Sequence, residues 1–406
     1  MEQSVQRTHM TRNRDRIGMI ERVLICVYFF LAYFEPYLNG MLGSLGKYII
    51  LLLIGVLCAN HRNIRIKPFH LCFVSWLLFK MVSMLWTSNW YIFELHLFSQ
   101  IGMVGLLIVL TAIPIDKTTI TSILNTMWLG STAIGVLSLF FSHPYHGVAT
   151  TRQVLFLFSQ EADPNNQAAF LLVGIAIAVY HLNVWKKCIL FSVITIAVNT
   201  YGLFLTGSRG GLVGLVCVCA ALWFTSLRGE KLSKKIRTTL IILLVCTLLY
   251  LLAITFLPEE IYNRLFDFSS YEGGSERDII WGNGWELFTS DLNFLFGAGW
   301  GSYYGYNGIY QAMHNTFLSM LCDVGLVGSL VFFVPIVKTC LQLIKKGNNF
   351  PVLLLLCGFV PSFFIDAINK RFFWNAIFVL FIFVVNEKML QECNCEALSN
   401  EKNSYH

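Results

Sequence analysis

Residues 188–227, CILFSVITIAVNTYGLFLTGSRGGLVGLVCVCAALWFTSL, contain one charged side chain, Arg209, between two long apolar runs. An α-helix needs roughly 20 mostly apolar residues to cross about 30 Å of hydrocarbon. The stretch therefore predicts two spanning helices joined by the turn LTGSRGG (205–211). In lipid only helices and closed barrels satisfy their backbone groups, and the alternating pattern of a barrel strand is absent. This pattern predicts an all-α membrane protein with an arginine held at the membrane surface.

The rest of the chain repeats the pattern of long apolar runs. Its 406 residues are 56% hydrophobic and only 13% charged, with a mean hydropathy of +0.63, whereas a soluble domain carries about a quarter charged residues. We predict a polytopic membrane protein of about twelve helices, forming a single domain over residues 1–406. The expected spans are 20–38, 41–59, 69–86, 95–113, 120–141, 165–183, 188–206, 210–227, 238–257, 317–337, 350–368 and 372–386.

Charge predicts how the protein lies in the membrane. Most of the 29 lysines and arginines fall in the amino-terminal arm and in alternate gaps after it. Because cytoplasmic loops carry the excess of Lys and Arg, both termini are expected in the cytoplasm. The net charge of +6 reflects this sidedness and does not indicate nucleic-acid binding. Six cations remain for the opposite side, where we expect the chemistry: Arg152, Arg209, Arg264, Arg277, Lys370 and Arg371.

Two outward gaps are long, 142–165 and 258–316. A loop as long as the second is uncommon in a compact protein unless it is functional. Its middle, 276–288, has apolar residues at partly helical spacing and predicts a short interfacial helix. The glycines of FGAGWGS (296–302) predict a turn whose backbone closely approaches another part of the chain.

Three outward residues could carry chemistry, and each also has a plainer interpretation. Arg209 opens a helix, where free N–H groups favour anions, but it could instead reach lipid phosphates or pair with an acid. Arg277 could bind an anion or pair with one of the many carboxylates of its loop. His314 could exchange a proton near neutral pH or be a simple interfacial residue. Asp323 lies deeper in the membrane, in the span expected at 317–337 that follows His314. It is a candidate partner for Lys80, in a functional or purely stabilising pair.

The sequence predicts neither a metal nor a cofactor. His143 and His146 are spaced too loosely for a convincing metal site, and Cys393 and Cys395 have no second pair or histidine nearby. No HExxH, GxSxG, Walker or Rossmann pattern is present. Any catalysis is therefore expected to be metal-independent.

Four segments together resemble the O-antigen ligase and polysaccharide polymerase family of bacterial envelope biosynthesis. They cover roughly residues 160–330, the expected catalytic core. The segments are Asp163-Pro-Asn-Asn-Gln-Ala168, Leu205-Thr-Gly-Ser-Arg-Gly-Gly211, Ser275-Glu-Arg-Asp-Ile-Ile-Trp281 with Phe296-Gly-Ala-Gly-Trp-Gly301, and His314-Asn-Thr-Phe-Leu318 with Asp323-Val-Gly-Leu-Val-Gly328.

The resemblance implies a glycosyltransferase of the bacterial cytoplasmic membrane with a GT-C-like fold. Its donor would be an undecaprenyl-diphosphate-linked glycan, and its acceptor a lipid-linked repeat or lipid A core. By this resemblance Arg209 and Arg277 bind the donor diphosphate, and His314 assists or positions the acceptor hydroxyl. The expected further substrate contacts are Arg264, Arg152, Ser208, Asn315 and Asn166.

Two questions stay open at this point. Polymerase and ligase activities are hard to separate. A transporter or flippase for lipid-linked sugars is the alternative class, but it predicts charges at mid-membrane and related halves of the chain. A non-catalytic assembly factor is a third interpretation. The concentration of charge at the outer rim favours the transferase.

Overall fold

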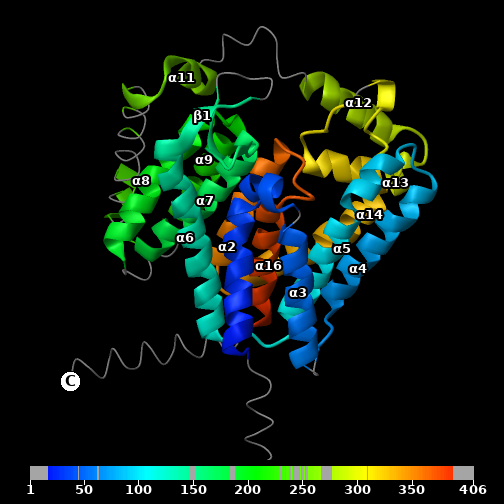
Figure 1. Cartoon of the computed structure of the whole chain (residues 1–406), viewed down its shortest axis with the longest axis horizontal. Coiled ribbons are helices and arrows are strands. Elements are labelled where there is room, and N and C mark those ends of the chain that lie inside the picture. The colour runs from blue at the N-terminus through cyan, green and yellow to red at the C-terminus, as the bar shows by residue number, and fades with distance from the viewer. Residues whose placement is uncertain are drawn as a thin grey trace, which may run out of the picture.

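The computed structural model describes a bundle of helices that is capped at one end by shorter elements (Figure 1). It describes residues 17–386 except for gaps at 44, 62–63, 147–151, 183–187, 228–230, 234, 237–238, 241–246, 248–250, 252–254, 267–276 and 309. The expected span at 238–257 lies largely outside the described residues.

Five of the described helices are long and apolar enough to cross a membrane, which confirms a polytopic membrane protein. They are α2 (Met19–Leu42), α4 (Pro68–Val82, continued by η1, Ser83–Leu85), α5 (Trp90–Ala112), α6 (Lys117–Phe141) and α14 (Thr316–Lys345). Shorter apolar helices stand at most of the other expected spans: α3 (Leu45–Asn60), α7 (Pro164–Tyr180), α8 (Ile189–Leu205), α9 (Arg209–Leu227), α15 (Phe350–Phe359) and α16 (Arg371–Val385).

One of the expected spans is wrong in extent. The apolar run 350–368 is helical only as far as Phe359 and is followed by the short η4 (Pro361–Phe363) and a loop. Pro361 explains this end, because a proline has no N–H to donate to the carbonyl four residues earlier and its ring crowds that carbonyl. The loop that results leads into α16 and contributes a wall of the site described below.

The centre of the bundle is aromatic. Trp76 of α4, Phe332 of α14 and Trp374 of α16 pack with ring centroids 4.7 to 6.3 Å apart. Nearly every residue of α16 is buried, and a helix that is apolar on all sides belongs in the core of a bundle. In Figure 1, α16 accordingly stands in the middle of the molecule, beside α2.

The cap contains strands, so the all-α expectation needs a correction. In the first outward gap, β1 (Ser142–Pro144), β2 (Gln153–Leu157) and β3 (Gln160–Glu161) form an antiparallel sheet in that order. His143 pairs with Val154, and Phe156 pairs with Glu161. Strands this short gave no alternating pattern to read in the sequence.

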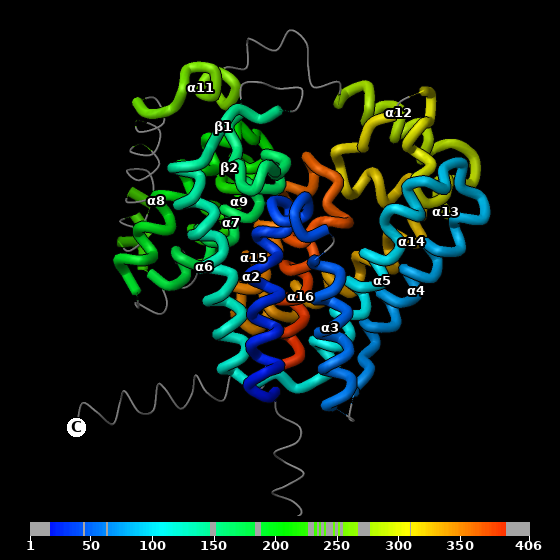
Figure 2. Tube along the Cα trace, viewed as in Figure 1, coloured from blue at the N-terminus to red at the C-terminus, as the bar shows by residue number. Residues whose placement is uncertain are grey.

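The second outward gap adds four short helical elements to the cap: α11 (Glu259–Phe266), α12 (Arg277–Thr289), α13 (Asn293–Phe296) and η3 (Tyr306–Gly308). The helix expected at 276–288 is confirmed as α12. Figure 2 shows α11, β1, β2 and α12 at the end of the bundle opposite the start of α2.

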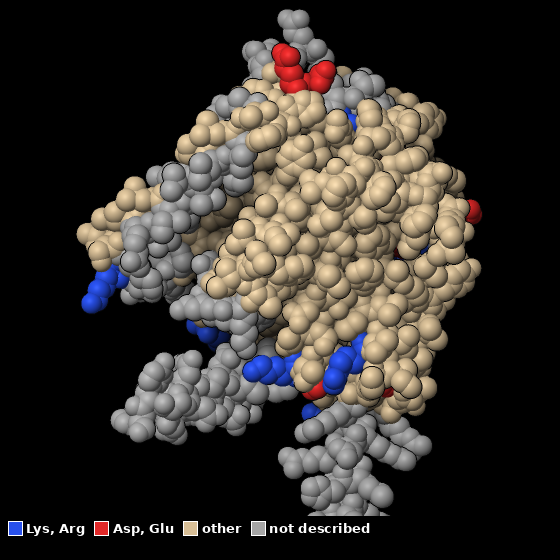
Figure 3. All heavy atoms as spheres, turned by 60° about the vertical axis from the view of Figure 1, so that its left-hand side comes forward, with Lys and Arg blue, Asp and Glu red and all other residues tan. Residues whose placement is uncertain are grey.

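Charge is unevenly distributed over the surface. On the face drawn in Figure 3, most of the visible Lys and Arg lie at the lower end and the left flank, whereas the most prominent acidic group lies at the upper end. The broad band between the two ends is almost free of charge on this face, as expected for a surface that contacts lipid.

The turn around Gly297 packs into a break in α14, which confirms the close backbone approach expected of its glycines. Gly325 leaves the helical conformation (φ 63°, ψ −167°), and the Cys322 carbonyl accepts a hydrogen bond from the N–H of Ala298 at 2.7 Å. A Cβ on Gly297 would lie 2.5 Å from the backbone of Asp323, and one on Gly325 would lie 2.4 Å from that of Leu295. Both positions therefore require glycine.

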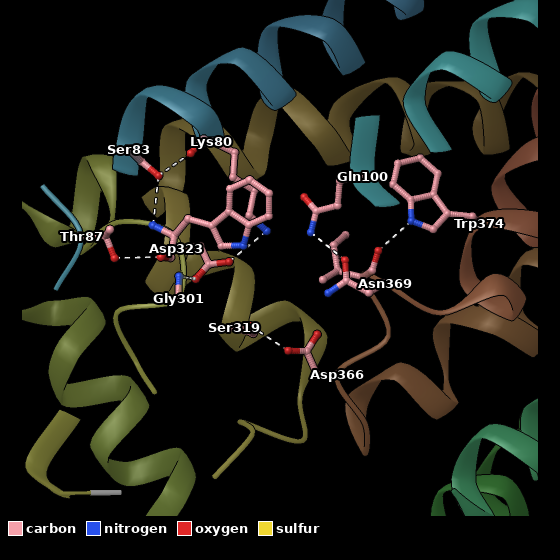
Figure 4. Close-up of polar contacts among 12 residues, drawn as sticks. Lys80, Ser83, Thr87, Gln100, Gly301, Ser319, Asp323, Asp366, Asn369 and Trp374 are labelled. Atoms are coloured by element: carbon pink, nitrogen blue, oxygen red, sulfur yellow. Dashed lines mark hydrogen bonds and ion pairs between the residues drawn. The ribbon is translucent and has the colours of Figure 1, made fainter. Parts of the chain in front are cut away.

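A buried ion pair holds the same region. Lys80 Nζ lies 3.0 Å from Asp323 Oδ2, and their side chains are 1% and 9% exposed, which confirms the expected pairing. Asp323 Oδ1 accepts from the Gly301 N–H at 2.9 Å, and Lys80 Nζ sits 4.5 Å from the centroid of the Trp300 ring. Figure 4 shows Asp323 between Lys80 and Gly301, so the pair joins α4, α14 and the turn.

Candidate functional site

The amino termini of α7 and α9 interlock at the capped end of the bundle. Asp163 caps α7 by accepting from the N–H groups of Asn165 and Asn166. The Ser208 hydroxyl donates to Asn165 Oδ1 at 2.7 Å and accepts from the Gly211 N–H at 3.0 Å. A Cβ on Gly211 would lie only 2.6 Å from that of Ala168. The motifs 163–168 and 205–211 therefore build one structure, from which Arg209 projects.

Helix α11 closes over the turn between α8 and α9. Arg209 Nε donates to the Arg264 carbonyl at 2.8 Å, and Arg264 Nε donates to the Gly207 carbonyl at 3.1 Å. This exchange holds the two arginine side chains at the turn that leads into the amino terminus of α9. Such a terminus favours an anion.

Arg277 contacts the loop between η4 and α16, which also packs against the start of α9. It is the first residue of α12, and its Nη2 donates to the Phe364 carbonyl at 3.1 Å. The Phe364 ring in turn packs against Gly210, where an added Cβ would lie 2.7 Å from Cδ2. The loop between η4 and α16 thus connects Arg277 with the residue next to Arg209.

Arg152 completes the group of cations. A Cβ on Gly207 would lie 3.4 Å from Arg152 Cγ and 3.1 Å from Arg264 Cδ, so both side chains cover that turn. Arg152 Nε is buried and has no hydrogen-bond partner in the part of the chain that the structure describes. Burial, followed by the charge of Arg264, lowers the pKa of Arg152 to about 10. The group remains charged at neutral pH, in surroundings that already hold positive charge.

His314 stands at the entrance to α14 within reach of this group. Its backbone adopts φ 50°, a conformation that is uncommon outside glycine and often found at functional sites. Trp281 of α12 fixes the preceding residue by donating from Nε1 to the Met313 carbonyl at 3.0 Å. Burial, and next the charge of Arg277, lower the pKa of His314. Its imidazole is therefore neutral near pH 7 and able to accept a proton.

A cavity of about 400 Å³ lies between α2, α5, the start of α7 and the start of α16. Asp163, Asn166 and Lys370 are among its lining residues. Asn166 Oδ1 is buried and has no hydrogen-bond partner among the described residues. The cavity thus offers a buried acceptor and a cation, and Asp163 on its wall is close enough to Arg152 to influence its charge.

The structure brings Arg152, Arg209, Arg264, Arg277 and His314 to one place. The polar groups of Ser208 and Asn315 hold local structure: the Ser208 hydroxyl bonds Asn165 and Gly211, and Asn315 Oδ1 caps α14 by accepting from the N–H groups of Phe317 and Leu318. The substrate contacts expected of these residues remain predictions.

Sequence reasoning named Lys370 as an outward cation and Asp163 within a motif, but it missed their influence on His314 and the role of the Phe364 carbonyl. Asp163 and Lys370 are close enough to influence the charge of His314. The Asp-Pro pair at 163–164 was a signal for a helix cap. A backbone carbonyl leaves no trace in a sequence. It also missed Glu161, which joins His143 and His146 in a cluster of three possible metal ligands.

The fold and the site define a polytopic membrane protein with a group of arginines and a histidine at the capped end of its bundle. The O-antigen ligase family model matches residues 190–333. This match includes Arg209, Arg264, Arg277 and His314 and supports the family resemblance of the motifs that lie within it, whereas the segment 163–168 lies before the matched residues. No curated protein matches the chain.

Proposed function

We propose that the protein is a membrane glycosyltransferase that transfers a glycan from undecaprenyl diphosphate to an acceptor hydroxyl. The acceptor would be a lipid-linked repeat, for an O-antigen, capsule or exopolysaccharide polymerase, or lipid A core, for an O-antigen ligase. The enzyme would lie in the bacterial cytoplasmic membrane with both termini in the cytoplasm and the site on the outer side. The observation that carries the proposal is the gathering of Arg152, Arg209, Arg264 and Arg277 around one helix terminus.

The chemistry explains why cations are needed. The acceptor oxygen attacks the anomeric carbon while the bond from that carbon to the phosphate oxygen breaks, so the diphosphate leaves with the electron pair and needs fixed positive charge. Arginine keeps its charge and binds phosphate oxygens through two parallel N–H groups. Such preorganised stabilisation is often the largest catalytic contribution, and one lost donor costs about 2.7–4 kcal/mol in comparable anion holes.

His314 would receive or orient the hydroxyl proton of the acceptor. Its lowered pKa supports this role, because only a neutral imidazole can accept a proton. Attack from the face opposite the diphosphate would invert the anomeric configuration. Each of these roles can be filled by side chains, so the proposed reaction is metal-independent.

The test is the glycan pattern of arginine variants. Arg209→Ala and Arg277→Ala should each lower activity by about 10²–10³-fold and remove long-chain glycan at normal membrane levels of the protein. Arg65→Ala, which removes an exposed arginine away from the site, is the matched control. Unchanged glycan ladders in both site variants would contradict the diphosphate site.

A deletion strain separates the two activities. A single repeat on the anchor would indicate a missing polymerase, whereas polymer left on the carrier lipid would indicate a missing ligase.

A further inference from the structure

The small sheet of the cap holds a cluster of three side chains that the proposed reaction does not use. His143 lies on β1, His146 follows that strand, and Glu161 lies on β3. One ligand atom from each lies within 4.8 Å of the others, and among the described residues no other three His, Cys, Asp or Glu side chains converge in this way.

Distances within the cluster suit a shared ion. His146 Nδ1 lies 3.2 Å and His143 Nε2 lies 3.7 Å from Glu161 Oε2. At Zn–ligand bonds of about 2.0–2.1 Å, two ligands of a tetrahedral zinc stand roughly 3.4 Å apart. Buried His143 Nε2 has no hydrogen-bond partner among the described residues. Its separation from the carboxylate is too long for a hydrogen bond but close to the spacing of two zinc ligands.

The local structure holds the ligands in place. The Phe156 ring on β2 packs against His143 with centroids 4.3 Å apart and lies 6.1 Å from the centroid of His146. The backbone N–H of His146 also donates to both carboxylate oxygens of Glu161, at 3.2 and 3.3 Å. This contact with the backbone of His146 orients the Glu161 carboxylate towards the two histidine rings.

We propose that His143 Nε2, His146 Nδ1 and the Glu161 carboxylate bind a Zn²⁺ ion, with water in the remaining position. Two imidazoles and a carboxylate are a ligand set that zinc accepts readily. The His146 side chain is 71% exposed, which gives the ion a path into the site.

The position of the ion suggests what it does. It would join β1, at the start of the sheet, to β3, two residues before Asp163 and the amino terminus of α7. Glu161 also lines the cavity that Asp163 and Asn166 line. The ion would therefore fix the sheet whose strand β2 directly follows Arg152, without touching a reacting atom.

The experiment measures zinc in the purified full-length protein in detergent, after chelator treatment and reloading with Zn²⁺ alone. All variants carry Cys393→Ser and Cys395→Ser, so that the cysteine pair of the tail cannot contribute. We expect close to one zinc per chain and a higher unfolding temperature after reloading. His146→Asn and Glu161→Gln should abolish both effects, because losing a ligand costs more than the roughly 10–100-fold in affinity that an outer partner costs.

Two controls keep the result clear. His146 is exposed and Glu161→Gln preserves shape, so equal elution on size exclusion and equal unfolding temperatures without zinc would show that the variants fold. Glu260→Gln changes an exposed carboxylate of α11 and should leave zinc binding intact. Wild-type protein that takes up no zinc, or variants that bind as much as the wild type, would overturn the proposal.

Discussion

At the scale of single residues, the site depends on cations that a membrane protein can rarely place near lipid. A charged group there is costly unless it faces water, a partner or a ligand. Arg152 illustrates the point, since its buried Nε has no hydrogen-bond partner among the described residues and its surroundings are already positive. An anionic ligand such as a diphosphate would give Arg152 Nε a hydrogen-bond acceptor and would also neutralise the surrounding positive charge.

The pH dependence of activity should report on His314. Burial and the charge of Arg277 lower the pKa of its imidazole below the usual 6.5, so the acid limb of kcat/KM should lie below pH 6.5. Lys370 also lowers this pKa, and Lys370→Met should move the limb towards higher pH. Rates measured from pH 4.5 to 8 with a lipid-linked donor in detergent provide the check.

The same pKa has a consequence for stability. A histidine whose pKa is lower in the folded than in the unfolded protein disfavours the folded state once it is protonated. Its contribution is thus present above the unfolded pKa and is lost as the pH falls below it. A His314→Asn variant should lose less stability on acidification than the wild type.

The activity profile has its own contradicting outcome. If Lys370→Met left the acid limb of kcat/KM unchanged, His314 would not be the titrating group.

At the scale of elements, the buried pair of Lys80 and Asp323 holds α4, α14 and the glycine-rich turn together. Lys80→Met alone should destabilise the protein by about 3–5 kcal/mol, because it leaves a buried carboxylate unpaired. The double variant Lys80→Met/Asp323→Asn should recover part of this loss, since the amide oxygen can still accept from the Gly301 N–H. Thermal unfolding of the three purified proteins gives the comparison.

The double variant decides between a stabilising and a functional pair. If the pair only stabilises, the double variant should regain glycan synthesis together with its stability. A stable double variant without activity would show instead that the charges themselves are required. Equal unfolding temperatures for the single variant and the wild type would contradict the pair as a structural link.

The elements also show what a sequence can and cannot predict. Long apolar runs located α2, α5, α6 and α14, because hydrocarbon thickness sets the minimum helix length, but α14 continues to Lys345, well beyond the end expected at 337. The break at Gly325 was not predictable, since it depends on the turn at 297 that packs against it. The short strands of the cap were missed for a similar reason, because their pairing depends on neighbours distant in sequence.

At the scale of the whole molecule, four motifs distant in sequence meet at one end of the bundle. The sequence predicted this from charge alone, because alternate gaps are basic and the remaining cations must share the other side. The structure adds how they meet: Ser208 links the first two motifs, and the Phe364 carbonyl receives Arg277. Hydrogen bonds of this kind depend on packing, which a single sequence does not specify.

The orientation of the bundle is the last prediction. A reporter fused after Lys231 should lie in the cytoplasm, so that β-galactosidase is active there and the phosphatase is not. A reporter inserted between residues 271 and 274 should lie outside the cytoplasm and show the opposite pattern. The reason is that a lipid-linked donor presented on the outer face can reach the arginines only if the capped end lies there. Assays with a periplasmic phosphatase and a cytoplasmic β-galactosidase as paired reporters distinguish the two sides. The reverse pattern would place the arginines in the cytoplasm, where the proposed donor and acceptor could not meet, and the proposed function would fail with it.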